Sequence, residues 1–213
     1  MGLREVKRER TRRLIADKAF ELFGDHGFGR TTVEQIAAAA EVGPSTLYRY
    51  FPTKETLVLE FVDDCLADAV TWFREQPALD LPDGLRAVIG RVLEQLETNP
   101  DRVRGVFVLA KQNGSVSAHL NELIWRFRND LADELVRRSA GDDPRHAEFV
   151  AALSAGIAMN IIESVVRVWV DAPDTVDAQQ LSRQAMALLK TGGIPLPAAQ
   201  DPTGISDNSG HDS

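Results

Sequence analysis

The sequence predicts an all-α protein. Through most of its 213 residues, apolar side chains recur every three to four positions, which is the spacing of one face of a helix. No segment alternates apolar and polar residues as a half-buried strand does, and no internal repeat is visible. Loops rich in Gly, Pro, Asn and Asp separate the helical segments. We expect two helical domains, over residues 1–57 and 58–191, and a disordered tail over 192–213, which has little apolar surface to bury.

The composition is that of a cytoplasmic protein. A hydrophobic content of 44% is ample for a core. We expect no membrane partner, because no apolar run approaches the roughly 20 residues that span a bilayer and the N-terminus lacks the apolar stretch of a signal peptide. A single cysteine, Cys65, excludes an internal disulfide and fits a reducing compartment.

The charge is distributed unevenly along the chain. Residues 1–54 carry 10 Lys/Arg and 7 Asp/Glu, a net charge of +3, whereas residues 55–213 carry 14 and 25, a net charge of −11. A basic segment on an acidic chain indicates a local contact surface for DNA, from which the acidic remainder would be repelled.

The first helical segment is amphipathic and ends in the glycine-rich stretch 24–29. Its predicted core face consists of Ile15, Ala19, Phe20, Leu22 and Phe23. Before it, residues 1–13 hold six Lys/Arg and two Glu. Two interpretations of these residues stay open, a fraying terminus in solvent and an arm or helix start that lies along phosphates or the minor groove.

Residues 31–54 read as two short helices at a sharp turn. Thr32 and Gln35 have the spacing of a capping box, so a helix starts at Val33. Gly43 frees the backbone for the turn, and Pro44 suits the first position of the next helix. That helix runs to about Tyr50 because Pro52 disfavours helical geometry in the residue before it.

The second short helix turns an unusual set of side chains outward. They are hydroxyls, phenols and a guanidinium without a carboxylate, a chemistry suited to phosphate oxygens and base edges. Lys54 follows at the N-terminus of a third helix, which Thr53 caps. A cation there opposes the helix dipole, yet it could hold a phosphate together with the free backbone N–H groups.

The segments AFELFGDHGF, TTVEQIA, EVGPSTLY and YFPTKETL, over residues 11–60, resemble the DNA-binding domain of the TetR family of bacterial transcriptional regulators. The alternative is a helical hairpin that only packs. The predicted DNA-binding residues are Thr32, Pro44, Ser45, Thr46, Tyr48, Arg49, Tyr50 and Lys54.

Six further helical segments follow, and the first of them would connect the DNA-binding unit to the rest. They are predicted over Lys54 to Gln76, Leu85 to Thr98, Asp101 to Gln112, Ser117 to Ser139, Pro144 to Val170, and Val176 to Thr191. The fifth is apolar on nearly every side, and the sixth carries one apolar stripe that includes Leu181 and Leu188. We predict a homodimer through these two helices, in line with the resemblance. The alternative is a monomer with the fifth helix at its centre.

Polar residues within that apolar helix point to a ligand or to internal pairing. Asn160, Glu163 and Arg167 share one stripe, and Glu163 could pair with Arg167. Aromatic residues elsewhere could wall a cavity. The predicted ligand-binding residues are Trp72, Phe73, Phe107, Lys111, Trp125, Phe127, Asn160, Glu163 and Arg167, with Gln112, Arg126 and Arg128 as further anchors. The C-terminal half is similar to a TetR subgroup that binds acyl-CoA-like molecules.

Together these patterns predict a ligand-responsive transcriptional regulator, a repressor that a small apolar or amphiphilic effector releases from a palindromic operator. Alternatives are an activator of the same family, and a helical enzyme or interaction module that does not bind DNA. The four histidines show no metal-ligand spacing, and no nucleophile motif or phosphate-binding glycine loop is present. We therefore expect no enzymatic activity, cofactor or metal.

Overall fold

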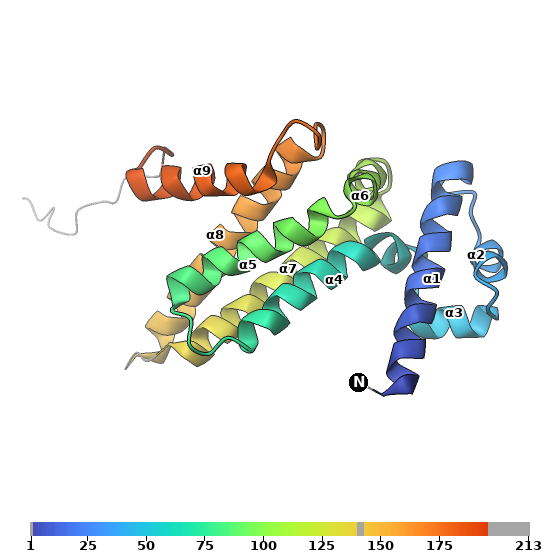
Figure 1. Cartoon of the computed structure of the whole chain (residues 1–213), viewed down its shortest axis with the longest axis horizontal. Helices are drawn as coiled ribbons and strands as arrows, with labels where there is room; N and C mark the ends of the chain where they lie inside the picture. The colour runs from blue at the N-terminus through green and yellow to red at the C-terminus, as the bar shows by residue number, and fades with distance from the viewer. Residues whose placement is uncertain (1, 140–142, 196–213) are drawn as a thin grey trace, which may run out of the picture.

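The computed structural model describes residues 2–139 and 143–195. Within these ranges the chain forms nine α-helices and no strand (Figure 1), which confirms the predicted all-α class. The helices are α1 (Leu3–His26), α2 (Val33–Ala39), α3 (Pro44–Tyr50), α4 (Lys54–Arg74), α5 (Leu81–Glu97), α6 (Pro100–Gln112), α7 (Gly114–Arg138), α8 (Pro144–Trp169) and α9 (Ala178–Thr191).

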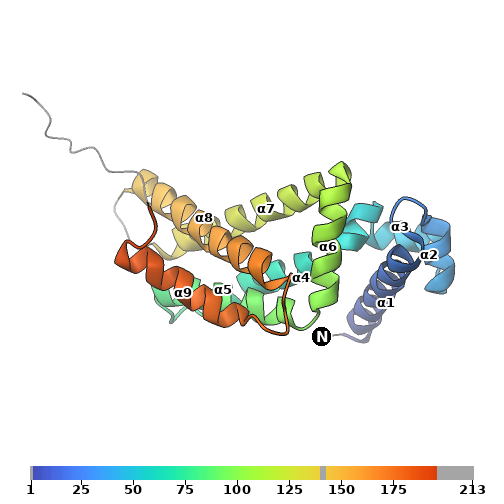
Figure 2. The same ribbon diagram turned by 90° about the horizontal axis from the view of Figure 1, so that it is seen from above.

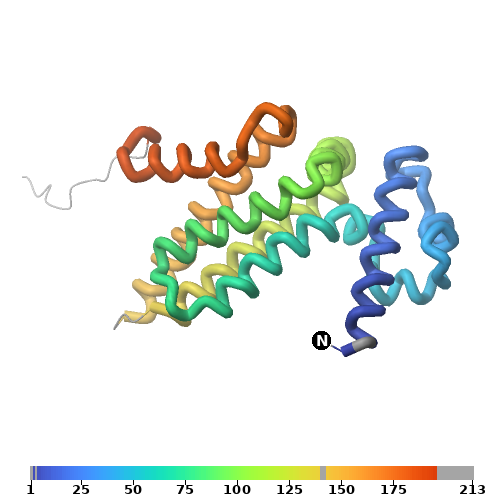
Figure 3. The backbone as a smooth tube through the Cα atoms, in the orientation of Figure 1, coloured from blue at the N-terminus to red at the C-terminus, as the bar shows by residue number. Residues whose placement is uncertain are grey.

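The helices form a small N-terminal unit and a larger bundle. Helices α1, α2 and α3 lie together at one end, and α4 leads from α3 into the bundle (Figure 3). There α4 packs against α5 and α7, α8 packs against α7, and α9 covers α5 and α8. Helix α6 stands crosswise at the end of the bundle that faces α1 (Figure 2). The predicted domain boundary at residues 57 and 58 falls inside α4, which belongs to both parts.

Local signals place most helix ends as predicted. At the start of α2, the backbone N–H of Thr32 donates to Gln35 Oε1 at 2.8 Å, and the backbone N–H of Gln35 donates to Thr32 Oγ1 at 3.2 Å, so the capping box is confirmed. Pro44 occupies the first turn of α3, and the Thr53 side chain caps α4. These caps stabilise the helix N-termini because side-chain oxygens accept hydrogen bonds from backbone N–H groups that have no partner within the helix.

The turn between α2 and α3 differs from the prediction. Glu41 has a φ of 54°, whereas Gly43 has a φ of −72° and is the N-cap of α3. The left-handed residue is therefore Glu41 rather than the glycine that we expected to free the turn. For a residue with a Cβ this conformation is costly, and the packing of α2 on α3 must hold it in place.

Helix α5 begins four residues earlier than predicted. The side chain of Asp80 accepts a hydrogen bond from the backbone N–H of Asp83 at 2.8 Å, which caps a helix that starts at Leu81. Gly84, which the predicted start at Leu85 left in a loop, lies inside this helix; the Phe73 ring packs directly on it, and a Cβ there would overlap the ring. The local cap at Asp80 therefore sets a boundary that the Pro and Gly content of residues 77–84 conceals.

Helix α8 also corrects an expectation. We predicted no segment that could span a membrane, yet α8 is long and apolar enough to do so by length and composition alone. In its most apolar window of 18 residues, 44% of the residues are buried within the protein, and a core helix meets the same criterion, so the finding is weak evidence for a membrane. The predicted disordered tail lies, from residue 196 onward, outside the described residues.

Candidate DNA-binding face and ligand cavity

Helix α3 presents the face that the sequence predicted. Leu47 and the following Phe51 are buried and anchor the helix, while Tyr48 is 49% exposed and Arg49 is exposed. Pro44 and Ser45 are exposed as well, and Thr46 and Tyr50 are half-buried. The Arg49 guanidinium lies 5.6 Å from the centroid of the Tyr50 ring, and none of the ion pairs among the described residues involves it. The guanidinium is therefore available to an external anion or base edge.

Lys54 has a structural role that the sequence did not reveal. Its Nζ donates to the backbone carbonyls of Phe28 at 2.9 Å and Thr31 at 3.0 Å, and it lies 4.7 Å from the centroid of the Phe28 ring. The ammonium thus ties the α1–α2 loop to the start of α4. An ammonium has three N–H donors, so one remains for a phosphate, and that contact stays a prediction. Thr32 is exposed at the start of α2.

The basic N-terminal segment is helical from Leu3 onward, so it is not a frayed terminus. Its arginines divide into two groups. Arg12 points inward and pairs with Asp64 on α4 at 2.6 and 2.8 Å, whereas Arg4, Arg8 and Arg10 are exposed. DNA contact by the exposed group stays a prediction.

A cavity of about 200 Å³, partly open to solvent, is lined by α4, α5, α6, α7 and α8 of the bundle. Its walls are almost wholly apolar. They consist of Val62, Leu66, Leu96, Val103, Val106, Phe107, Leu120, Ile124, Met159, Ile162 and Val166, and the polar lining is Asn121, Glu163 and Arg167. An apolar cavity with a few polar groups at one side is the usual form of a small-molecule site.

Three of the nine predicted ligand-binding residues meet at this cavity, namely Phe107, Glu163 and Arg167. The pairing expected between Glu163 and Arg167 is replaced by another: Arg128 Nη2 on α7 lies 3.4 Å from Glu163 Oε2. The Nε of Arg128 is buried and has no hydrogen-bond partner. Arg128 is therefore the cation that fixes the carboxylate at the polar edge of the cavity.

The other six predicted ligand-binding residues lie elsewhere. Trp125 is 65% exposed on α7, and Lys111 and Asn160 are also exposed. Trp125 follows the cavity residue Ile124, and Asn160 follows Met159, so each points about 100° away from the cavity around its helix. Phe73 is a core residue that packs on Gly84. Trp72 lies under the Arg91 guanidinium. Phe127 is buried and lines a small crevice together with Asp63 and Leu66.

Helix α8 exposes an apolar stripe that faces away from the bundle. Phe149 is 67% exposed and Leu153 is 55% exposed, and Val150, Ile157 and Val168 are exposed along the same helix. On the predicted stripe of α9, Leu188 is exposed, whereas Leu181 and Ala185 pack against the core. Exposed apolar side chains in one row are unfavourable in water and favour a partner surface.

Potential metal ligands and the single thiol can be placed within the part of the chain that the structure describes. No group of three His, Cys, Asp or Glu side chains there is placed to hold a metal ion. Cys65 is buried, and the loss of solvation raises the pKa of its thiol to about 12, so it remains a protonated, unreactive thiol.

An N-terminal three-helix unit with an exposed, carboxylate-free third helix, joined to a helical domain with an apolar cavity, defines a two-domain helix-turn-helix protein. Residues 15–61 match the family described as bacterial regulatory proteins, tetR family. The chain belongs to this family, as the sequence motifs predicted.

Known relatives agree with this assignment. The chain is 35% identical over 156 residues to the HTH-type transcriptional regulator TcmR of Streptomyces glaucescens; the match covers 71% of this chain but only 63% of that relative. Among solved structures, FadR from Bacillus subtilis, in complex with stearoyl-CoA, is 23% identical with a TM-score of 0.58, over 84% of this chain and 97% of that one. A putative TetR-family regulator from Syntrophomonas wolfei is 17% identical with a TM-score of 0.61, over 91% and 100%. At these identities the structural likeness concerns the fold.

Proposed function

We propose that the protein is a transcriptional repressor that binds a two-fold operator as a homodimer and releases it when a small effector occupies the cavity in the bundle. Residues 1–57 would read the DNA, and residues 58–191 would bind the effector and dimerise. The observation that carries this proposal is the exposed face of α3, on which Tyr48 and Arg49 are exposed and Arg49 enters no ion pair among the described residues. A protein that binds DNA in this way acts in the cytoplasm and needs no catalytic step.

The chemistry of α3 supports DNA as the partner. Arg49 can donate two parallel hydrogen bonds to the acceptors of a guanine, and Tyr48, Ser45 and Thr46 can donate to phosphates. Arg4, Arg8 and Arg10 add positive charge along α1, which forms part of the same unit. The negative charge of residues 55–213 would repel the duplex from the rest of the molecule.

The apolar stripe of α8 supports the dimer. Two copies of α8 and α9 can form a four-helix arrangement across a two-fold axis, which buries Phe149, Leu153 and Ile157 of each copy. A two-fold dimer would present two α3 helices, one for each half of an operator whose half-sites lie about 34 Å apart.

The cavity supports an effector that is compact and largely apolar. Its volume of about 200 Å³ is below the roughly 300 to 1,000 Å³ of common ligand sites, so a long acyl-CoA would require the helices to open. Glu163, Arg128 and Arg167 at its edge can orient a polar head group. A short amphiphile, or the end of a longer one, suits the site as it stands.

The proposal is tested by DNA binding with matched charge variants. Operator sequences are selected from random duplexes with the wild-type protein, and affinities are measured by fluorescence anisotropy at fixed salt. Arg49→Ala should lose about 1 to 3 kcal/mol on the selected sequence and relax base preference at one position of each half-site. Arg86→Ala, which removes an exposed arginine of α5, should leave the affinity unchanged. Failure to enrich any sequence, or equal losses for the two variants, would contradict the proposed role of α3.

A further inference from the structure

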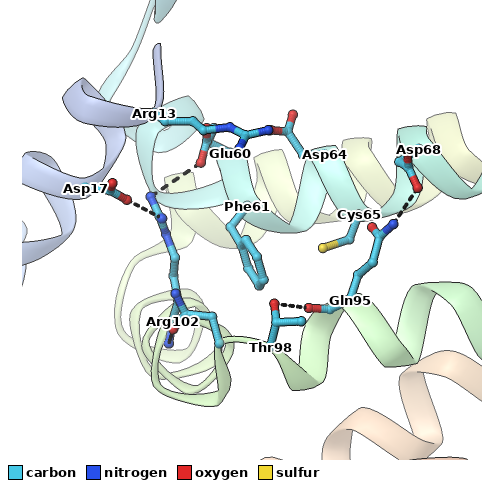
Figure 4. A pocket seen from close by; sticks show the side chains of 11 residues that line it. Arg13, Asp17, Glu60, Phe61, Asp64, Cys65, Asp68, Gln95, Thr98 and Arg102 are labelled. Carbon is cyan, nitrogen blue, oxygen red and sulfur yellow. Dashed lines mark hydrogen bonds and ion pairs between the residues drawn. The ribbon is translucent and has the colours of Figure 1, made fainter. Parts of the chain in front are cut away.

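A partly buried charged cluster joins the N-terminal unit to the bundle, at an open pocket distinct from the apolar cavity (Figure 4). Glu60 on α4 is 4% exposed and Arg102 on α6 is 6% exposed. Arg12 on α1 donates to Glu60 at 3.1 Å, Arg102 Nη2 lies 3.4 Å from Glu60 Oε2, and Arg102 Nη1 donates to Asp17 on α1 at 2.8 Å. We refer to Arg12, Asp17, Glu60, Asp64 and Arg102 as the interdomain joint.

The interdomain joint is incompletely paired. Both terminal nitrogens of the Arg12 guanidinium donate to the Asp64 carboxylate, at 2.6 and 2.8 Å, so Asp64 competes with Glu60 for this cation. The Nε and Nη2 of Arg102 are buried and form no hydrogen bond, although the guanidinium lies near the rings of Phe20 and Phe61. A buried carboxylate between two partly engaged arginines is sensitive to any change in its own charge.

Helix α6 connects the interdomain joint to the apolar cavity. Val103, Val106 and Phe107 line the cavity from one side of the helix. Arg102 and Gly105 face α1 from the adjacent face of the helix, and a Cβ at Gly105 would lie 2.8 Å from the Phe20 ring. A shift of α6 therefore alters the cavity wall and the support of α1 together.

Several charged groups surround Glu60 at the pocket. From α1 these are Arg12, Arg13 and Asp17, and from α6 Arg102. Helix α4 adds Asp64, Asp68 and the Cys65 thiol. Helix α5 adds the neutral Gln95 and Arg91, which donates a hydrogen bond to Asp68. Burial, and secondly the Asp64 carboxylate, raise the pKa of Glu60 to about 7, against the opposing effect of Arg102 and Arg12. The proton on Glu60 is therefore exchanged near neutral pH.

We propose that Glu60 makes the interdomain joint a proton-responsive clamp, which holds α1 firmly when the carboxyl is protonated and loosens it when the buried carboxylate is charged. Protonation of Glu60 favours the conformation in which the pKa of Glu60 is higher. That conformation is the one in which α1 packs on the joint and keeps Glu60 buried. A firmly held α1 presents α3 in a fixed orientation, so less ordering is needed on DNA binding and affinity is higher. This regulatory consequence rests on the proposed DNA-binding function.

The first test requires no DNA. Amide hydrogen exchange of α1 is measured at pH 6 and pH 8 on the full chain, corrected for intrinsic rates, for wild type and Glu60→Gln. The glutamine keeps the shape of the protonated acid and cannot charge. The ratio of wild-type to variant protection should fall about three- to tenfold from pH 6 to pH 8. A ratio that is constant within twofold, or that rises, overturns the proposal.

A second pair of variants distinguishes a titrating group from a merely structural one. Asp64→Asn, at a half-exposed position, removes a charge that repels the Glu60 carboxylate and frees Arg12, so the midpoint of the pH dependence should move to lower pH. Arg102→Met removes a positive charge that stabilises the Glu60 carboxylate, and the midpoint should move to higher pH. Glu122→Gln, on the exposed face of α7, serves as the control and should change nothing. Midpoints that do not separate in these directions refute the role of Glu60.

Measurements of operator affinity test the regulatory consequence separately from the clamp itself. With the selected operator, the affinity of Glu60→Gln relative to wild type should be near one at pH 6 and about three- to tenfold higher at pH 8. A constant ratio overturns the regulatory consequence. If wild type binds no DNA at either pH, the proposed function fails, while the exchange experiment still decides whether the clamp exists.

Discussion

Arg102 and Val103 are neighbours on α6 and serve two adjacent faces of the helix, about 100° apart: Arg102 reaches Asp17 on α1 at 2.8 Å, and Val103 lines the apolar cavity. One helix turn thus touches both the proposed effector site and the support of the DNA-binding unit. Because packed helices move as rigid bodies, a ligand that displaces Val103 also displaces Arg102.

Lys54→Met should lower stability and DNA affinity together. It removes two hydrogen bonds to the carbonyls of Phe28 and Thr31, and the loss is expected to be about 1 to 3 kcal/mol in urea unfolding. If the third N–H binds a phosphate, the salt dependence of DNA affinity should become shallower by about one unit. Lys111→Met, at an exposed lysine of α6, is the control. Unchanged stability would show that the two carbonyl contacts are dispensable.

The N-terminal unit was predictable because its signals are local. Thr32 with Gln35, Pro44 and Thr53 each act within four residues, and each defines a helix end as expected. The start of α5 carries a local signal too, the Asp80 cap, but the Pro and Gly content of residues 77–84 indicates a loop and conceals it; the contact of Phe73 with Gly84 is not visible in the sequence.

The candidate sites were only partly predictable from the sequence. Helical spacing placed Glu163 and Arg167 on one stripe, but it could not reveal that Arg128 on another helix pairs with Glu163. The interdomain joint escaped detection for the same reason, since Asp17 and Arg102 are 85 residues apart. A lone buried glutamate in a helix shows no pattern that distinguishes it from an exposed one.

Leu153→Glu should produce monomers. Leu153 is 55% exposed and lies in the middle of the apolar stripe of α8, so a charge there costs little in the monomer but is buried without a partner in the dimer. Sedimentation at micromolar concentration should show a single species of half the mass, with DNA affinity reduced at least tenfold because two half-sites are no longer bound together. Trp125→Glu, at a more exposed position on α7, should remain dimeric. A dimeric Leu153→Glu protein would move the interface to another surface.

Short amphiphiles should bind in the cavity and weaken DNA binding. Octanol, octanoate and octylamine share one chain and differ in head charge, so their relative affinities show whether Glu163 or the arginines dominate the polar edge. Leu120→Trp should abolish binding of all three by filling the cavity. Coupling is reciprocal and typically about 1 to 3 kcal/mol, so operator DNA should weaken the amphiphile by the same factor as the amphiphile weakens DNA. Equal amphiphile affinities in calorimetric titrations with and without operator would exclude an inducing role.

Stability should depend on pH through Glu60, with a definite sign. The pKa of Glu60 is raised from 4.5 to about 7 in the folded chain, chiefly by burial, so between these values the folded chain holds a proton that the unfolded chain has released. The wild type therefore loses stability as pH rises from about 4.5 to 7, and each pKa unit corresponds to about 1.4 kcal/mol. Glu60→Gln lacks this loss, so its free energy of unfolding relative to wild type should increase by about 1 to 3 kcal/mol between pH 5 and pH 8. Urea unfolding at one fixed protein concentration measures this difference, because dimerisation adds a concentration-dependent contribution. The exposed Glu122→Gln should follow the wild type at every pH, and a Glu60→Gln curve parallel to the wild type would show that the buried carboxyl has its ordinary pKa.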